Sequence, residues 1–254
     1  MGRVLTRRWL VAALALALIV GLLGAARYVS QRGAERAPAA HSEEAYRKAR
    51  LQMVSTQIRD MGVADRDVLR TMESVPRHAF VPSEYLDRAY GDHPLPIGYG
   101  QTISQPYIVA VMTELLDPDP TDCVLEVGTG SGYQAAILAD LVAEVYTIEI
   151  VPELCAQAGE RLDALGYENV HTLCGDGYYG WEEHAPYDGI IVTCAPDHIP
   201  QPLVNQLADG GRMVIPVGPP GSYQVLWLIE RDGDEIRSER VMGVVFVPLT
   251  GGPH

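Results

Sequence analysis

The spacing of apolar residues predicts helices in the part of the chain that begins at residue 43. Across residues 43–72 apolar positions recur at intervals of three and four, which is typical of one face of a helix. Gly62 ends the first helix, and Asp65 is placed to cap a second, shorter one. Another helix is predicted over residues 108–116. The intervening residues 76–100 have no periodicity and contain several Pro and Gly residues, so we expect a long loop there.

After residue 120, short apolar runs alternate with helical segments. Strands are predicted over residues 123–127, 145–149, 171–174, 188–194 and 213–217, and helices over residues 133–141, 152–165 and 202–207. This alternation predicts an α/β fold with a doubly wound, mainly parallel sheet, preceded by a helical N-terminal part. Two further runs, residues 224–230 and 241–247, flank the charged residues 231–235 and predict antiparallel C-terminal strands.

The first 42 residues differ from the rest. Three arginines precede an uninterrupted apolar run over residues 9–26, which would reach about 27 Å as a helix. This pattern is typical of a membrane anchor and equally of a cleavable signal peptide, and we favour the anchor slightly. Residues 27–42 read as a polar linker. The folded domain is therefore expected over residues 43–254.

The net charge of the chain argues against one class of function, nucleic-acid binding. The chain has 19 Lys and Arg against 33 Asp and Glu, a net charge of −14. Residues 1–40 hold six arginines and one glutamate, which leaves 13 basic and 32 acidic groups, or −19, for the rest. A body this acidic repels phosphate backbones, so we expect no nucleic-acid partner.

The four cysteines form no C-x-x-C pair and do not cluster with histidines at metal-ligand spacing, so no metal site is predicted. We expect all four thiols to be free, because the predicted elements do not obviously bring any two of them together. The four residues are Cys123, Cys155, Cys174 and Cys194.

A glycine-rich loop lies where the first predicted strand gives way to a helix. It reads Glu126-Val-Gly128-Thr129-Gly130-Ser-Gly132, and glycines there allow a ligand to approach the backbone closely. Glu149 follows 21 residues after Gly128, at the end of the next strand, where a carboxylate is placed to hold both hydroxyls of a ribose.

The pattern favours S-adenosylmethionine (SAM) over a dinucleotide. A dinucleotide site requires G-x-G-x-x-G and binds a pyrophosphate, whereas this loop is G-x-G-x-G beside the acidic Glu126. SAM carries an ammonium and a sulfonium group and no phosphate. Asp176, next to Gly177, is placed to accept a hydrogen bond from the adenine amino group.

Six segments in order resemble the protein-L-isoaspartate (D-aspartate) O-methyltransferase family, and the resemblance spans roughly residues 50–254. They are residues 75–82 (VPRHAFVP), 100–107 (GQTISQPY), 126–132 (EVGTGSG), 175–177 (GDG), 210–212 (GGR) and 247–250 (VPLT). The segment QTISQP is the part not shared with SAM methyltransferases in general. The hydrophobic N-terminus departs from the family, which is typically soluble and cytoplasmic.

The resemblance implies a Rossmann-like SAM-dependent enzyme that esterifies the free α-carboxylate of L-isoaspartyl and D-aspartyl residues in damaged proteins and so initiates their repair. It divides the domain into an N-terminal part with the active-site loop (residues 43–118), a SAM-binding core (119–218) and C-terminal strands (219–254). Ser104 is implied as the catalytic residue, orienting the carboxylate or the cofactor. The implied cofactor contacts add Gln101, Thr102 and Ile103 to the residues above, and Val247 and Thr250 are implied to lie beside the peptide.

Two other functions remain open from sequence. One is a SAM methyltransferase for a small carboxylate, and the other is a membrane-tethered module that binds damaged protein without turnover. We expect isoaspartyl proteins and peptides as partners, a monomer, and a possible membrane tether through residues 9–26. We expect the catalytic domain on the cytoplasmic side, where SAM is made, possibly anchored to the inner membrane, with an exported or periplasmic domain as the alternative.

Overall fold

The computed structural model describes residues 42–219 and 221–253. The chain divides into two units at residue 45, and the fold and site below belong to the second, residues 46–254. The predicted anchor or signal segment and nearly all of the predicted linker lie outside the described residues. None of the helices that the structure describes is long and apolar enough to span a membrane.

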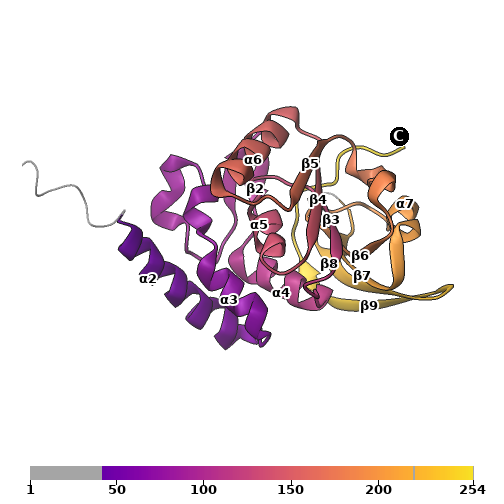
Figure 1. Ribbon diagram of the computed structural model, residues 1–254, viewed down its shortest axis with the longest axis horizontal. Coiled ribbons are helices and arrows are strands. Elements are labelled where there is room, and N and C mark those ends of the chain that lie inside the picture. The colour runs from indigo at the N-terminus through magenta and orange to yellow at the C-terminus, as the bar shows by residue number, and fades with distance from the viewer. Residues whose placement is uncertain (1–41, 220, 254) are drawn as a thin grey trace, which may run out of the picture. The chain divides into compact units, whose positions relative to one another are not determined.

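Helices dominate residues 43–116 (Figure 1). They are α2 (Glu43–Met53), the π-helix η2 (Val54–Ile58), η3 (Arg59–Met61), α3 (Arg66–Ser74), η4 (Arg77–Phe80), η5 (Ser83–Arg88) and α4 (Pro106–Leu116). Asp65 caps α3 as predicted, because its carboxylate accepts the N–H groups of Asp67 and Val68. Gly62 ends η3 in the left-handed conformation, with φ of 115°.

The stretch predicted as a loop contains more structure than its sequence indicates. Besides η4 and η5, it includes β1 (Leu95–Gly98), which pairs in an antiparallel hairpin with β2 (Gln101–Ile103). The prediction of an irregular loop was therefore wrong for this part. Strands of four and three residues, joined by Tyr99 and Gly100, are too short to produce a periodic pattern.

The sheet has seven strands in the order β5-β4-β3-β6-β7-β8-β9. The first five strands of this order pair in parallel, and β8 and β9 are antiparallel, which confirms the predicted fold class. The strands are β3 (Cys123–Val127), β4 (Glu144–Glu149), β5 (Val170–Cys174), β6 (Tyr187–Val192), β7 (Leu207–Val217), β8 (Gln224–Asp232) and β9 (Glu235–Val244). The connecting elements are α5 (Tyr133–Ala139), α6 (Pro152–Leu165), η6 (Gly177–Tyr179), η7 (Glu182–His184) and α7 (Gln201–Asn205).

Both faces of the central strands are covered, which explains their nearly continuous apolar sequences. Val124 and Ile191 belong to the core on the side of α4, α5 and α6. Their neighbours Leu125 and Ile190 lie directly opposite each other in register and face the core on the side of α7. Because the chain turns back from β5 to enter β6 beside β3, the carboxyl ends of β3 and β6 form the switch point where such sheets bind ligands.

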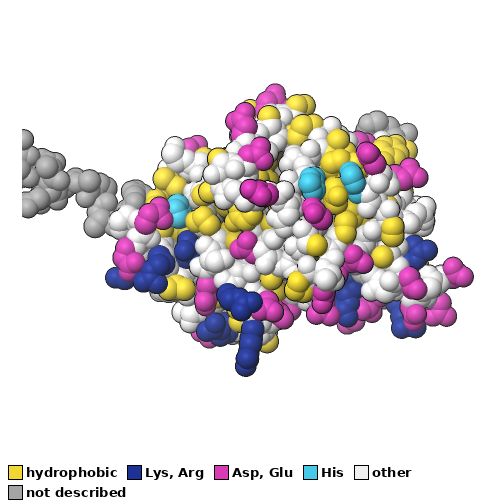
Figure 2. Space-filling model, viewed as in Figure 1, with side chains coloured by type: hydrophobic (Ala, Val, Ile, Leu, Met, Phe, Trp, Pro, Cys, Tyr) yellow, Lys and Arg dark blue, Asp and Glu magenta, His cyan; other side chains and the backbone are white. Residues whose placement is uncertain are grey.

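The C-terminal strands form an antiparallel edge, but the boundary between them differs from the prediction. The residues predicted as a charged connection are mostly strand, and β9 begins at Glu235 instead of residue 241. The first six residues of β9 are exposed, so they carry none of the alternation by which a half-buried strand is recognised. Figure 2 shows acidic side chains spread over the face in view, with basic side chains mainly along its lower edge.

The expectation of four free thiols was wrong. Cys155 and Cys174 form a disulfide, with their Cα atoms 5.6 Å apart. Cys174 pairs with Glu149 in the register of β5 and β4, and Cys155 lies near the start of α6, which follows β4 directly. Both sulfurs therefore lie at the same end of the sheet. Cys123 and Cys194 are free.

Candidate functional site

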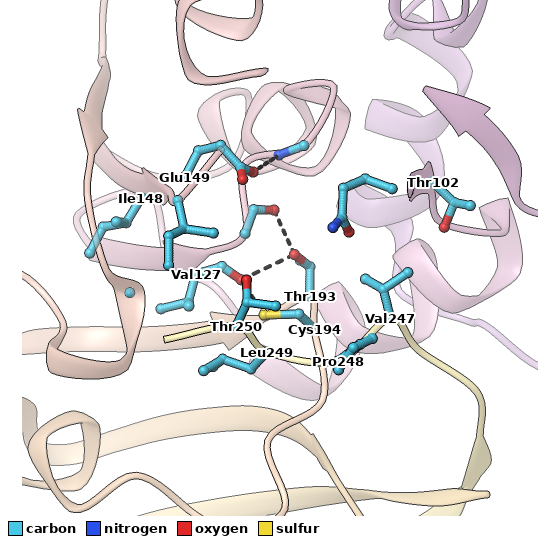
Figure 3. A pocket seen from close by; sticks show the side chains of 15 residues that line it. Thr102, Val127, Ile148, Glu149, Thr193, Cys194, Val247, Pro248, Leu249 and Thr250 are labelled. Carbon is cyan, nitrogen blue, oxygen red and sulfur yellow. Dashed lines mark hydrogen bonds between the residues drawn. The ribbon is translucent and has the colours of Figure 1, made fainter. Parts of the chain in front are cut away.

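A cavity opens at the carboxyl ends of the parallel strands, at the switch point between β3 and β6 (Figure 3). Its walls come from five regions of the chain: the hairpin strand β2, the ends of β3 and β4, the start of η6 after β5, the residues that follow β6, and the C-terminal segment. The lining residues are Gln101, Thr102, Val127, Gly128, Gly130, Ile148, Glu149, Ile150, Gly177, Thr193, Cys194 and residues 247–250. We call this the first cavity.

The glycine loop turns tightly between β3 and α5. Gly128, Gly130 and Gly132 all have positive φ values, of 99°, 54° and 87°. A side chain at Gly128 would be obstructed as well, because a Cβ atom there would lie 2.4 Å from the hydroxyl oxygen of Thr193. The loop therefore exposes backbone to the first cavity where other residues would place side chains.

Glu149 anchors this loop to the end of β4. One carboxylate oxygen accepts the N–H of Gly130 at 2.8 Å (Figure 3), and the other accepts the N–H of Val151 at 2.9 Å. The residue is only 5% exposed and still lines the first cavity. A carboxylate offers about four acceptor positions, so Glu149 retains capacity for a ligand's hydroxyl groups.

Glu126 lies beneath the loop and does not line the cavity. It is fully buried, and one of its carboxylate oxygens accepts the hydroxyl of Thr147 at 2.6 Å. The hydroxyl of Thr129 lies 2.6 Å from that of Thr147, which extends this buried chain. Desolvation, assisted by the nearby charge of Glu149, raises the pKa of Glu126 to about 8. The side chain of Glu126, which the sequence predicts as a negative charge beside the loop, is therefore mostly protonated at neutral pH.

The C-terminal segment closes one side of the first cavity. Ala195 donates its N–H to the carbonyl of Val247 at 2.8 Å and accepts the N–H of Leu249 at 2.9 Å, which forms a parallel bridge after β6. Further along, the carboxylate of Asp176 accepts the N–H of Gly252 at 2.8 Å. We call residues 247–252 the C-terminal strap, because it is fixed at both ends across the site.

A second cavity adjoins the first and is larger and more apolar. It is lined by Met61, Pro94, Thr102, Ser104, Gln105, Tyr107, Ile108, Thr193, Tyr223 and residues 242–247. Thr102, Thr193 and Val247 line both cavities. A reaction between a group bound in one cavity and a group bound in the other would take place beside these three residues.

Ser104 belongs to the second cavity, in a turn that Asp92 supports. One oxygen of the Asp92 carboxylate accepts the side-chain N–H of Gln105 at 2.7 Å, and the other accepts the backbone N–H of Tyr107 at 3.0 Å. The turn between β2 and α4 is thereby fixed. In the part of the chain that the structure describes, no protein group hydrogen-bonds the hydroxyl of Ser104, which leaves it available to a ligand.

The profile of one protein family, "Protein-L-isoaspartate(D-aspartate) O-methyltransferase (PCMT)", matches residues 49–254. The chain belongs to this family. Among its relatives, a protein-L-isoaspartate O-methyltransferase 2 of Shewanella sediminis is 55% identical over 208 residues, which cover 82% of this chain and 85% of the relative. A protein of the same name from Syntrophobacter fumaroxidans is 59% identical over 189 residues, or 74% of this chain and 76% of the relative.

Solved structures of the family share the fold. A protein-L-isoaspartate O-methyltransferase structure with 29% sequence identity superposes with a TM-score of 0.73, covering 81% of this chain and 66% of the other. A Plasmodium falciparum β-aspartate methyltransferase, crystallised with S-adenosyl-L-homocysteine, has 26% identity and a TM-score of 0.69, covering 79% of this chain and 98% of the other.

The structure brings most of the residues implied by the family resemblance to the two cavities. Gln101, Thr102, Gly128, Gly130, Glu149, Gly177, Val247 and Thr250 line the first cavity, and Ser104 lines the second. Five lie behind the walls: Ile103, Glu126, Thr129, Gly132 and Asp176 line neither cavity. Of these five, Asp176 contacts the C-terminal strap, and the others support the loop or the core.

Sequence reasoning missed several lining residues, notably Thr193 and Cys194. They directly follow β6, which pairs with β3, the strand that leads into the glycine loop. The rule that ligands bind at the carboxyl ends of parallel strands was the signal that could have found them. Desolvation and the carboxylates of Glu149 and Glu126 raise the pKa of the Cys194 thiol to about 12. Cys194 is therefore a neutral thiol and not a nucleophile at physiological pH.

Proposed function

We propose that the first cavity binds SAM, that the second holds an isoaspartyl residue of a damaged protein, and that methyl transfer takes place where they meet. The observation that carries this proposal is the shared wall of Thr102, Thr193 and Val247. It supplies one place where a methyl donor in the first cavity and a carboxylate beside Ser104 come together. Membership of the family supports the same reaction.

The residues of the first cavity suit SAM. The glycine loop leaves space for a ligand against the backbone, and Glu149 retains acceptor capacity for the two ribose hydroxyls. Asp176 is proposed to accept the adenine amino group, although it already accepts the N–H groups of Tyr178 and Gly252. The lining contains the carboxylate of Glu149, and the loop is not the G-x-G-x-x-G of a pyrophosphate site, which favours a cationic cofactor.

The chemistry asks little of the protein beyond positioning. The α-carboxylate of an isoaspartyl residue has a reference pKa near ~3.5, so it is ionised at neutral pH and needs no general base. Its oxygen attacks the methyl carbon, the sulfur–methyl bond breaks, and the electron pair of that bond stays on sulfur. The products are a neutral methyl ester and S-adenosylhomocysteine. Holding oxygen and methyl in line at about 3–3.5 Å supplies most of the catalysis.

Ser104 is proposed to orient the attacking carboxylate. Its hydroxyl faces the second cavity without a protein partner among the described residues, so it can donate to a carboxylate oxygen. It acts as a donor and not as a nucleophile, since a serine nucleophile needs an adjacent base. The apolar wall formed with Ile108 and Phe246 excludes water from the carboxylate and strengthens that hydrogen bond.

Transfer of a labelled methyl group from SAM to an isoaspartyl peptide tests the proposal, with the corresponding aspartyl peptide as control. We expect base-labile methyl ester on the isoaspartyl peptide alone. Methylation of small carboxylic acids with neither peptide modified would favour a small-molecule methyltransferase. Peptide binding by calorimetry without any methyl transfer would favour the non-catalytic binder.

The compartment and oligomeric state are proposed separately. The Cys155–Cys174 disulfide counts against the cytoplasmic placement, because disulfides persist mainly in oxidising compartments. The cytoplasmic origin of SAM still favours it. Alkaline phosphatase fused after residue 254 would be active only if the domain is exported.

We propose that the protein is a monomer, and light scattering during gel filtration would test its oligomeric state.

A further inference from the structure

Thr193, the residue that follows β6, hydrogen-bonds the glycine loop. Its N–H donates to the carbonyl of Val127 at 2.9 Å, which extends the parallel pairing of β3 and β6 by one residue. Its hydroxyl oxygen lies 2.6 Å from the carbonyl oxygen of Gly128 and 3.1 Å from that of Val127 (Figure 3). A hydroxyl has a single hydrogen to donate, so the shorter contact identifies the Gly128 carbonyl as its main acceptor.

This contact holds the Gly128 carbonyl, while the N–H groups on either side of that residue bond to β4. The N–H groups of Gly128 and Thr129 both donate to the carbonyl of Ile148, at the end of β4, at 2.8 and 3.2 Å. The turn at Gly128 is therefore held between β4 on one side and Thr193 on the other. There is no spare space, because a Cβ atom on Gly128 would lie 2.4 Å from the Thr193 hydroxyl oxygen.

The same side chain lies at the boundary between the two cavities. Thr193 lines both of them, together with Thr102 from β2 and Val247 from the C-terminal strap. Of these three, Thr193 is the one whose side chain hydrogen-bonds the glycine loop in the described structure. A displacement of its hydroxyl would move the loop and the passage between the cavities together.

We propose that Thr193 is a positioning residue for methyl transfer: its hydroxyl holds the Gly128 carbonyl in the cofactor wall, and its side chain borders the passage to the substrate. The inference rests on the proposed function. The hydroxyl acts through the glycine loop and takes no part as an acid or base, because an ionised carboxylate requires neither.

Three substitutions separate the hydroxyl from the bulk of the side chain. Thr193→Val keeps the volume but places a methyl group against two carbonyl oxygens, whereas Thr193→Ser keeps the hydroxyl. Thr193→Ala removes both without adding a clash. For Thr193→Val we expect a KM for SAM about tenfold higher and a kcat about tenfold lower, because the partly buried carbonyl of Gly128 loses its donor. The KM of Thr193→Val for an isoaspartyl peptide should stay within twofold of wild type. For Thr193→Ser, kcat and both KM values should stay within threefold of wild type.

Thr113→Val is a matched control. Thr113 is buried whereas Thr193 is partly buried, and the hydroxyl of Thr113 also donates to a backbone carbonyl, that of Val109, at 2.8 Å. It lies in α4 and lines neither cavity. We expect this variant to lower the midpoint of thermal unfolding and to leave both KM values unchanged. The control therefore separates a general loss of stability from a loss of positioning.

Wild-type kinetics in Thr193→Val, or a loss limited to thermal stability as in the control, would overturn the inference. If Thr193→Val does not fold, SAM binding to Thr193→Ala by calorimetry decides: a dissociation constant raised about tenfold supports it, and an unchanged one overturns it. This binding measurement needs no peptide. If the wild type binds SAM but methylates no isoaspartyl peptide, the proposed function fails while the role of Thr193 in the cofactor wall is still tested.

Discussion

The carboxylate of Asp176 accepts the backbone N–H of Gly252, a residue 76 positions further along the chain, at 2.8 Å. The contact fixes the far end of the C-terminal strap beside the first cavity, and the second oxygen of Asp176 accepts the N–H of Tyr178 at 3.0 Å. A Cβ atom on Gly251 would lie 2.3 Å from this carboxylate, so the strap passes close to it. Asp176 thus links the turn after β5 to the chain's last residues.

Two truncations test the strap. Removing residues 253–254 keeps the Gly252 N–H and should leave activity near wild type. Removing residues 247–254 deletes residues that line both cavities, so we expect methyl transfer to fall below detection in the labelled-peptide assay. Full activity in the longer truncation would show that the strap is dispensable.

Asp176→Ala should raise the KM for SAM several-fold, and an unchanged KM would limit Asp176 to a role in the turn.

Glu149→Ala is expected to raise the KM for SAM by roughly 10- to 100-fold, in line with about 1.5–3 kcal/mol for hydrogen bonds to a charged group. The variant loses the proposed ribose contact and also the acceptor for the Gly130 N–H. Glu149→Gln should be impaired as well, because its amide nitrogen cannot accept the second N–H. The KM for peptide should change little. Glu153→Ala, an exposed residue in the first turn of α6, is the control. Equal losses for both substrates would argue against the ribose assignment.

Ser104→Ala should lower kcat about tenfold or more, with a smaller effect on the KM for SAM. The hydroxyl is proposed to donate to the carboxylate in the second cavity, away from most of the cofactor. Steady-state kinetics with the isoaspartyl peptide measure the effect, and Ser83→Ala, at an exposed serine, provides the comparison. A wild-type kcat would mean that Ser104 serves only the turn that Asp92 supports.

Glu126 predicts a pH dependence of stability. Its pKa is raised from 4.5 to about 8 in the folded chain, mainly by desolvation, so the folded state binds its proton more tightly than the unfolded state does. The contribution to stability is full below about pH 4.5 and is lost as pH rises to about 8. Glu126→Gln does not titrate, so its free energy of unfolding relative to wild type should rise between pH 5 and pH 8. Urea unfolding of both proteins at four pH values measures this, and a constant difference would contradict it.

The disulfide should stabilise the domain and the cofactor wall. It closes a loop of about 20 residues between α6 and β5, for which chain entropy predicts about 3 kcal/mol of stabilisation. We expect reduction, or the double variant Cys155→Ala with Cys174→Ala, to lower the midpoint of thermal unfolding and weaken SAM binding several-fold. Reductant should have no effect on the double variant. If reductant also lowered the midpoint of thermal unfolding of that variant, the cause would not be the disulfide.

The central sheet could be predicted because its strands are covered on both faces and therefore read as apolar runs between helices. The β1–β2 hairpin could not, since each of its strands is too short to carry a pattern, and exposed β9 resembles a charged loop. Pairings between distant segments were also missed. The disulfide depends on the register of β4 and β5, and the role of Thr193 depends on the adjacency of β3 and β6, neither of which the local sequence encodes.

The position of the C-terminal strap has a practical consequence for handling the protein. Only two residues would separate Gly252 from an affinity tag or fluorescent protein joined after residue 254. Such a tag would begin close to the edge of the first cavity. Such a fusion would report expression and compartment faithfully while obstructing turnover. Enzyme for kinetics should therefore carry no addition after residue 254, and any tag belongs before α2.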